Sequence, residues 1–261
     1  MGIEYDGRSF KGFQRQDSVS SIQSEIEKAL SSVANQPIVV TGAGRTDAGV
    51  HATGQVVGFS TEIERSLESW RKGVNSLTSN AINVSWCSEV PADFHARFSA
   101  TSRRYIYCWY EDPQRSPILE GLAVQANNID VKTMDVSGQY LLGEHDFTTF
   151  RGSGCQSKSP NRCIQQIGVH RMGHFVLLDI KANAFLLHMV RNIAGAIWEV
   201  GLGKKSPAWI SEVLDKRDRT VIGKTAPPHG LYLVGVDYSI GDFPASRLPG
   251  FLRIGEVPDW F

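Results

Sequence analysis

Apolar residues recur at helical spacing in four segments of the chain. Within residues 20–34, the apolar side chains from Ile22 to Val33 follow one another at three- and four-residue intervals, which is the spacing of one helix face. Ser20 and Gln23 stand at the separation of a capping box, so the sequence predicts that this helix begins there. The same apolar spacing predicts further helices over residues 66–77, 183–201 and 206–214.

Two of these helices carry end signals. Gly201 closes the apolar pattern of residues 183–201, and glycine favours the backbone conformation that ends a helix. At the start of the last helix, Ser206 is suited to the N-cap and Pro207 to the first helical position. We therefore expect these two boundaries to be sharp.

Short runs of β-branched and aromatic residues predict strands between the helices. The clearest runs are residues 54–61, 103–110, 174–182 and 231–239. Helices and strands are interspersed without the regular alternation that builds a doubly wound parallel sheet. The pattern therefore favours an α+β fold with a largely antiparallel sheet.

Turn-forming residues suggest how the chain is divided. The Pro-containing turn at residues 90–94 is a candidate hinge, and the polar segment 152–163 is a candidate mobile surface loop. We accordingly expect an N-terminal α+β half over residues 1–95, a C-terminal α+β half over residues 96–245, and a tail over residues 246–261. Because the tail ends in Trp260 and Phe261, we expect it to cover an apolar surface.

Composition narrows the class of protein. A chain of 261 residues can form one large domain or two smaller ones. The formal net charge of +0 gives no overall electrostatic signature, so a nucleic acid would have to bind a local basic patch. The four cysteines form no CxxC pair, the first residues form no apolar leader, and no apolar run approaches the length of a membrane span. We expect a reduced, cytoplasmic protein without a membrane segment.

Residues 42–54, GAGRTDAGVHATG, place a charged Asp47 among glycines. A phosphate cradle is disfavoured because Asp47 occupies the position of the third glycine of a GxGxxG motif, and no GK[ST] sequence follows. A metal site formed by Asp47 and His51 is disfavoured because no further ligand lies nearby in the sequence. A zinc site formed by Cys155, Cys163, His170 and His174 is also disfavoured by spacing, because seven residues separate the two cysteines and zinc ligands usually pair two to four residues apart.

Two interpretations of Asp47 then remain open from the residues alone. Asp47 can be part of a tight turn in which it bonds its own backbone. Alternatively, it is a carboxylate that Arg45 keeps ionised and that the following strand holds in place, which suits a nucleophile or a base.

Five segments resemble the tRNA pseudouridine synthase A family, and they follow the family's order over most of the chain. They are IEYDGRSFKGFQRQ, GRTDAGVHATGQVVGF, FHARFSATSRRYIY, LLGEHDFTTFR and IKANAFLLHMVRN. The resemblance implies isomerisation of uridine to pseudouridine in the anticodon stem-loop of tRNA, at positions 38 to 40, without a cofactor or a metal. It also implies a homodimer, with two α+β halves whose sheets join into one extended, mainly antiparallel sheet and enclose a cleft.

The resemblance assigns roles to individual residues. Asp47 is similar to the catalytic aspartate, which attacks either C6 of the base or C1′ of the ribose. Tyr105 resembles the tyrosine that packs on the target base, although the strand pattern by itself favours a core aromatic. Arg191 resembles the arginine that pairs with the catalytic carboxylate, and Arg45 is placed to steer the RNA. We interpret His51 as a loop-organising residue.

Basic residues gather locally despite the neutral total charge. Between residues 147 and 192 the only acid is Asp179. We expect phosphate contacts, and hence salt-sensitive RNA binding, from Arg8, Lys11, Arg15, Arg97, Arg103, Arg104, Arg151, Lys158, Arg162, Arg171, Lys181 and Arg191. Two alternatives to the function that the resemblance implies stay open. One is a synthase that acts on other RNA positions, and the other is an RNA-binding relative without catalysis.

Overall fold

The computed structural model describes residues 1–17, 19–241, 243–253 and 260. Contacts divide the chain into two compact units, each with its own strands, helices and core. Unit 1 comprises Met1–Thr101 and Tyr232–Phe261, and unit 2 comprises Ser102–Leu231.

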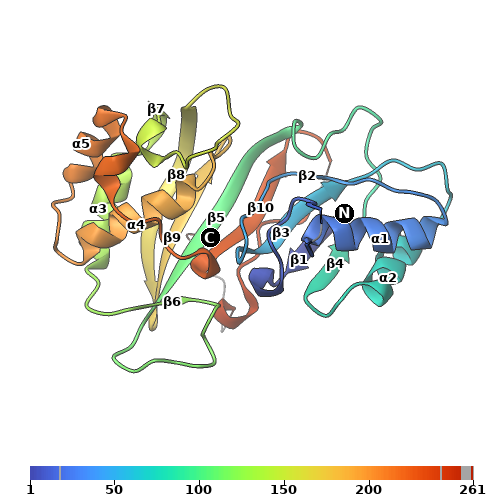
Figure 1. The fold of residues 1–261 in the computed structure, drawn as a ribbon, viewed down its shortest axis with the longest axis horizontal. Coiled ribbons are helices and arrows are strands. Elements are labelled where there is room, and N and C mark those ends of the chain that lie inside the picture. The colour runs from blue at the N-terminus through green and yellow to red at the C-terminus, as the bar shows by residue number, and fades with distance from the viewer. Residues whose placement is uncertain (18, 242, 254–259, 261) are drawn as a thin grey trace. The chain divides into compact units, whose positions relative to one another are not determined.

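Unit 1 is a small α+β layer structure (Figure 1). Its strands are β1 (Gly2–Tyr5), β2 (Thr41–Gly42), β3 (His51–Gly58), β4 (Ile82–Trp86) and most of β10 (Leu231–Tyr238). They follow the order β4-β1-β3-β10, with β2 also paired to β3. All these pairs are antiparallel except β3 with β10. Helices α1 (Ile22–Ala34) and α2 (Leu67–Leu77) pack against each other, and short 3-10 turns lie at η1 (Gly7–Ser9) and η5 (Gly250–Leu252).

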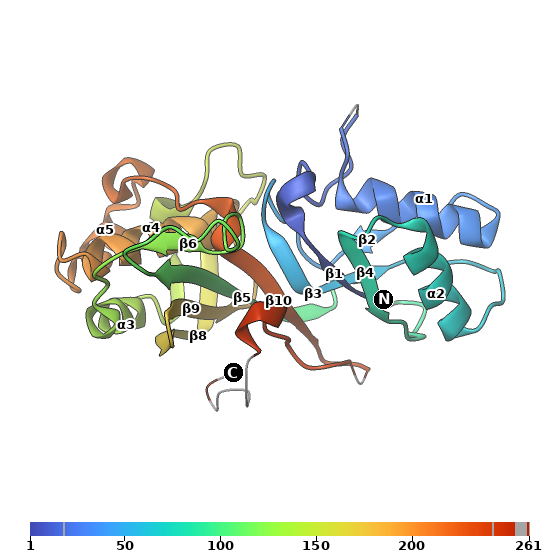
Figure 2. The same cartoon turned by 90° about the horizontal axis from the view of Figure 1, so that it is seen from below.

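Unit 2 is also an α+β structure, with more α-helices than unit 1 among the described residues (Figure 2). Its strands are most of β5 (Ala100–Glu111), β6 (Val124–Ala126), β7 (Gly143–Asp146), β8 (Asn161–Met172) and β9 (Phe175–Ala182). They run in the order β5-β9-β8-β7, all antiparallel, while β6 pairs with β5 in parallel. Helices α3 (Val131–Gln139), α4 (Met189–Gly201) and α5 (Trp209–Lys216) pack together, with 3-10 turns η2 (Thr148–Phe150), η3 (Arg219–Ile222) and η4 (Pro228–Gly230). The predicted α+β class with mainly antiparallel pairing is confirmed.

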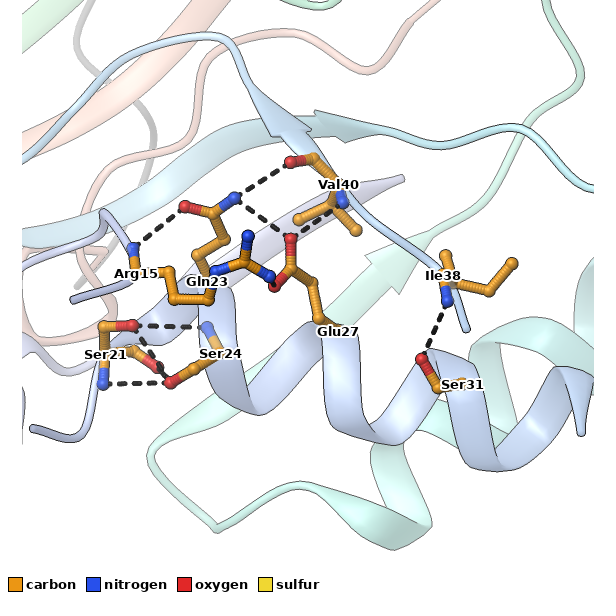
Figure 3. A network of polar contacts seen from close by, with 8 residues as sticks. All are labelled: Arg15, Ser21, Gln23, Ser24, Glu27, Ser31, Ile38 and Val40. Carbon is orange, nitrogen blue, oxygen red and sulfur yellow. Dashed lines mark hydrogen bonds and ion pairs between the residues drawn. The ribbon is translucent and has the colours of Figure 1, made fainter. Parts of the chain in front are cut away.

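The start of α1 differs from the prediction by one residue, for a tertiary reason. Ser21 is the N-cap and forms the capping box with Ser24. Gln23 instead turns inward and takes part in a buried network (Figure 3). Its side chain accepts from Arg15 N at 2.9 Å and donates to the Glu27 carboxylate at 3.0 Å. A buried amide with these partners could not also cap the helix.

That network fixes the chain on both sides of α1. The Glu27 carboxylate accepts hydrogen bonds from Val40 N at 3.0 Å and from the Arg15 guanidinium at 2.8 Å. Gln23 Nε2 also donates to Val40 O at 3.0 Å (Figure 3). The segment that leads into β2 is therefore held by side chains of α1.

Two other helix starts also differ from the prediction. α4 begins at Met189 rather than at residue 183, because His188 adopts a left-handed backbone conformation with φ of 60°. α5 begins at Trp209, so Ser206 and Pro207 lie in the preceding turn. The predicted end of the longest helix at Gly201 is confirmed.

Several elements carry too weak a local pattern to be predicted. Helix α3 contains Ser137 and Gly138, and both residues lower helix propensity. Asp130 nevertheless caps this helix by accepting from Thr133 N at 3.1 Å. Strand β8 begins at Asn161, so the segment 152–163 is not a loop throughout.

The contact-defined units differ from the halves that the sequence suggests. The first boundary lies at Thr101 and Ser102, close to the predicted change at residue 95. Residues from Tyr232 onward group with unit 1 because β10 pairs with β3, with Tyr232 opposite His51. In the predicted tail, Leu248 and Leu252 are buried, whereas residues 254–259 and Phe261 lie outside the described residues.

Within the part of the chain that the structure describes, no helix combines the length and the apolar character that a membrane span requires.

Candidate active site

Asp47 lies in the loop that joins β2 to β3 in unit 1. The two strands pair antiparallel, with Gly42 opposite Val57, so the loop is the turn of a hairpin. Val50 N donates to Asp47 O at 3.1 Å, and Gly49 has a φ of +79°. Asp47 is half-buried. The turn thus displays the carboxylate-bearing residue between two paired strands.

A buried polar cluster fixes the residues around Asp47. The Thr46 hydroxyl bonds the Tyr5 hydroxyl at 2.8 Å. The Gln55 amide accepts from Gly44 N at 3.2 Å and donates to Gly44 O at 2.7 Å. Burial raises the pKa of Tyr5 to about 12, so its hydroxyl keeps its proton near neutral pH. The loop therefore has side-chain supports on both β1 and β3.

Residues 6–13 form a second support, which we call the N-terminal strap. Phe13 N donates to Thr46 O at 3.0 Å. Gly12 has a φ of +95°, and a Cβ built there would lie 2.9 Å from Thr46 O. A Cβ built on Gly7 would overlap the Val50 carbonyl. The strap contacts the Asp47 turn backbone to backbone, and only glycine permits this approach.

His51 connects the strap to two strands. It is 2% exposed, and its Nδ1 accepts from Gly7 N at 3.2 Å. The same nitrogen lies 3.3 Å from Asp6 Oδ1. The imidazole stacks on the Tyr232 ring at 4.7 Å with an interplanar angle of 14°. These contacts suit the loop-organising role that we inferred from the sequence.

Asp6 keeps its charge next to this histidine. Partial burial would raise its pKa, but the hydrogen bonds from Arg8 and the nearby charges of His51 and Arg8 together lower the pKa below its ordinary value. Arg8 Nε donates to both carboxylate oxygens, at 3.0 and 2.9 Å. Within the strap, Arg8 therefore holds the Asp6 carboxylate in its ionised form.

The other predicted site residue of unit 1 is Arg45. It is exposed and stands two residues before Asp47 on the same loop. Because Thr46 between them is tied to Tyr5, the backbone that carries both charged residues is held in place.

Tyr105 and Arg191 belong to unit 2. Tyr105 lies in β5 opposite Ile180 of β9 and is 7% exposed. Its ring meets the Phe185 ring edge to face, with 5.1 Å between centroids. The side chain is thus buried against Phe185, and its role in substrate binding stays a prediction.

Arg191 is held near the start of α4. Its Nε donates to Ala226 O at 2.9 Å, and Ala226 N donates back to Arg191 O at 3.1 Å. Burial lowers the pKa of His229, and the Arg191 charge lowers it further. Arg191 is half-buried and is therefore not the fully solvated residue that a helix surface usually carries.

Several arginines that we expected to bind phosphate are engaged within the protein. Arg104 pairs with Asp179 at 2.6 Å, Arg171 with Glu111 at 2.6 Å, and Arg15 with Glu27 at 2.8 Å. These carboxylates offset the positive charge locally. The expected phosphate contacts of these arginines stay a prediction, and sequence alone could not show which acids face each arginine.

The chain matches a known protein family over most of its length. Residues 1–99 and 138–239 match the model of a family described as tRNA pseudouridine synthase. The chain belongs to the tRNA pseudouridine synthase family. Asp47, Arg45 and Arg191 lie within the matched ranges, whereas Tyr105 lies between them.

Curated relatives of the family are similar over nearly the full length. The chain is 52% identical over 239 residues to the tRNA pseudouridine synthase A of Photobacterium profundum, covering 91% of this chain and 92% of the relative. It is 52% identical over 248 residues to the protein of the same name from Aliivibrio fischeri, covering 95% and 94%. A solved Cbf5-Nop10-Gar1 complex contains a chain with 11% identity and a TM-score of 0.37, covering 90% of this chain and 48% of that one. This last similarity is too low to support any conclusion.

The sequence did not reveal the residues that hold the Asp47 turn in place. Tyr5, Thr46 and Gln55 are all buried, but they come from separate segments of the chain. The one available signal was Gln55, a polar residue directly before the apolar Val56 and Val57 of the predicted strand. The glycines of the strap were visible, but not what they contact.

Proposed function

We propose that this chain isomerises uridine to pseudouridine in tRNA, with the Asp47 carboxylate as the attacking group. The family match and the two relatives of the same name support the reaction class. The observation that carries the role of Asp47 is the support of its turn by Thr46, Tyr5 and Gln55. A nucleophile needs this kind of fixed position, because orientation supplies a large part of the rate enhancement.

The reaction needs no oxidant and no external group. A carboxylate oxygen bonds to C6 of the uracil or to C1′ of the ribose, and the bond between N1 and C1′ breaks. The uracil rotates, C5 bonds to C1′, and the proton on C5 passes to solvent while N1 gains one. If the carboxylate is on C6, its bond breaks after C5 has bonded to C1′; if it is on C1′, C5 displaces it as the new bond forms. Either way Asp47 is restored. The product is an isomer of the substrate.

The remaining assignments extend this proposal. We assign Tyr105, Arg45 and Arg191 to substrate binding, and the anticodon stem-loop to the target region. A base must leave its stack to reach a carboxylate, and the glycines beside Asp47 leave room for the approaching nucleotide.

We further propose a cytoplasmic homodimer. Light scattering should then give a mass of twice the 28.8 kDa of one chain, and a monomer at micromolar concentration would contradict it.

Incubation with unmodified tRNA tests the proposed function. Purified protein should convert uridines of the anticodon stem-loop, as read by chemical mapping of pseudouridine along the whole tRNA. Product elsewhere in the tRNA would instead support a synthase of different site specificity. Binding without any product would support a relative that has lost catalysis.

The strap provides a prediction about the position of the turn. Gly7→Ala should lower the single-turnover rate by about 10- to 100-fold, because the new methyl group displaces the strap from Val50 and shifts Asp47. Gly138→Ala is the matched control, since a Cβ there makes only ordinary contacts, the nearest at 3.5 Å. An unchanged rate in Gly7→Ala would show that the strap does not position the turn.

A further inference from the structure

The turn formed by residues 94–99 presents an aromatic side chain to solvent. Phe98 is 76% exposed. Exposing a phenylalanine is unfavourable for a protein that leaves it in water. Phe94, in the same turn, instead packs its ring against Tyr238 at 5.0 Å. The exposure of Phe98 therefore calls for an explanation of its own.

Hydrogen bonds define the backbone under Phe98. His95 Nδ1 accepts from both Arg97 N and Phe98 N, each at 3.2 Å. Across the turn, His95 N donates to Ser99 Oγ at 3.0 Å, and Ser99 N donates to His95 O at 2.9 Å. A ligand that binds this turn has little backbone to order, so less binding energy is lost.

The turn is also anchored from below within unit 1. Ala96 is buried, and its carbonyl accepts from the Tyr238 hydroxyl at 2.7 Å. The Phe94 ring packs on Phe243 at 5.9 Å, and Phe243 packs on Trp86 at 5.3 Å. These contacts attach the base of the turn to an aromatic cluster and leave its tip exposed.

The surroundings of the Phe98 ring combine flat surfaces with positive charge. The His95 ring lies 4.3 Å from it at an angle of 31°. The Arg97 guanidinium carbon lies 5.7 Å from the ring centroid. Aromatic platforms beside cations are what single-stranded nucleic acid binds, because each base has a π face and each nucleotide carries a phosphate.

We propose that Phe98 is a stacking platform for an unpaired nucleotide of the RNA substrate, with Arg97 attracting its phosphate. This inference rests on the proposed function, since it takes tRNA as the ligand, and adds a contact outside the Asp47 turn. The charged and polar neighbours of the ring favour a nucleotide over an apolar protein surface. His95 is the positioning residue, because its ring nitrogen holds the two amides that set the direction of Phe98.

Affinity for unmodified tRNA tests the stacking contact. Phe98→Ala should weaken binding by about tenfold, whereas Phe98→Trp should stay within about twofold of the wild type. Val39→Ala is the matched control, because Val39 is also largely exposed, at 64%, and lies outside the turn. A fully paired RNA duplex should bind the wild type and Phe98→Ala equally, since it offers no unstacked base.

Two further variants separate charge from position. Arg97→Ala should reduce the slope of log affinity against log salt by about one, and Phe98→Ala should leave that slope unchanged. His95→Ala should weaken tRNA binding in the wild-type background and have little effect in Phe98→Ala, because coupled residues are not additive.

The outcomes are distinguishable from failure of the proposed function. If the wild type binds and modifies tRNA but Phe98→Ala binds it equally well, the stacking inference is wrong and the proposed function stands. If Phe98→Ala changes the oligomeric mass, the ring faces a second copy of the chain and the inference is also wrong. Absence of any pseudouridine with wild-type protein counts against the proposed function, while the effect of Phe98 on RNA affinity is still measured.

Discussion

Replacing Asp47 with alanine should lower the rate of pseudouridine formation by at least about 10³-fold, because no other group then attacks the uridine. Affinity for unmodified tRNA should stay within about threefold, since the residues assigned to RNA binding remain. The measurement is a single-turnover time course with chemical mapping of the product, together with a binding titration.

Asp47→Asn sharpens this result. The amide has nearly the shape of the carboxylate but is a far weaker nucleophile, so Asp47→Asn should be as inactive as Asp47→Ala. The support of the turn by Thr46 and Tyr5 should keep both variants folded, with unfolding midpoints close to the wild type. An Asp47→Asn variant that retains more than about a tenth of the wild-type rate would contradict a nucleophilic role.

Replacing Asp179 with alanine should cause the largest loss of stability among the substitutions considered. Asp179 is fully buried in β9 and accepts from Arg104 Nε at 2.8 Å and Arg104 Nη2 at 2.6 Å. Gln166 Nε2 adds a third hydrogen bond at 2.9 Å. Removing one partner of a buried pair costs about 3–5 kcal/mol, because the other charge is left buried. Thermal unfolding should show a midpoint lower by about 10 °C.

Two controls separate burial from charge. Glu68→Ala breaks an exposed ion pair with Arg71 on α2, and exposed pairs add little to stability, so its midpoint should be unchanged. The double variant Asp179→Leu with Arg104→Met should be more stable than Asp179→Ala, because neither charge is then buried alone. If Asp179→Ala unfolds like the wild type, the pair does not stabilise unit 2.

Local interactions explain which parts of the fold the sequence predicted. Helix α2 begins after Ser66 and ends at Leu77 as predicted, since its cap and apolar spacing lie within a few residues. The predicted capping residues of α1 were wrong by one position, because Gln23 has buried partners as far away as Val40. α4 begins later in the chain than predicted because His188 takes a left-handed conformation. The neighbouring residues in the sequence do not indicate this conformation.

The candidate site also has a part that the sequence indicated and a part that depends on tertiary contacts. The sequence alone located a charged residue in a glycine-rich turn before a strand, and its resemblance to a family gave Asp47 a role. What holds that turn was not visible, because Tyr5 and Thr46 are 41 residues apart and meet only when β1 pairs with β3. The contact of Gly7 with Val50 depends on the same pairing.

By itself, the sequence determined the α+β class and the approximate positions of the longer elements, and it narrowed the interpretation of Asp47 to a tight turn or an ionised nucleophile or base. Only the tertiary structure decided which charges serve the fold. Arg104 could be counted as a phosphate ligand until the register of β5 and β9 placed it beside Asp179, 75 residues away. The physical reason is that helix periodicity and turn chemistry act over a few residues, whereas partners across a sheet are set by strand pairing.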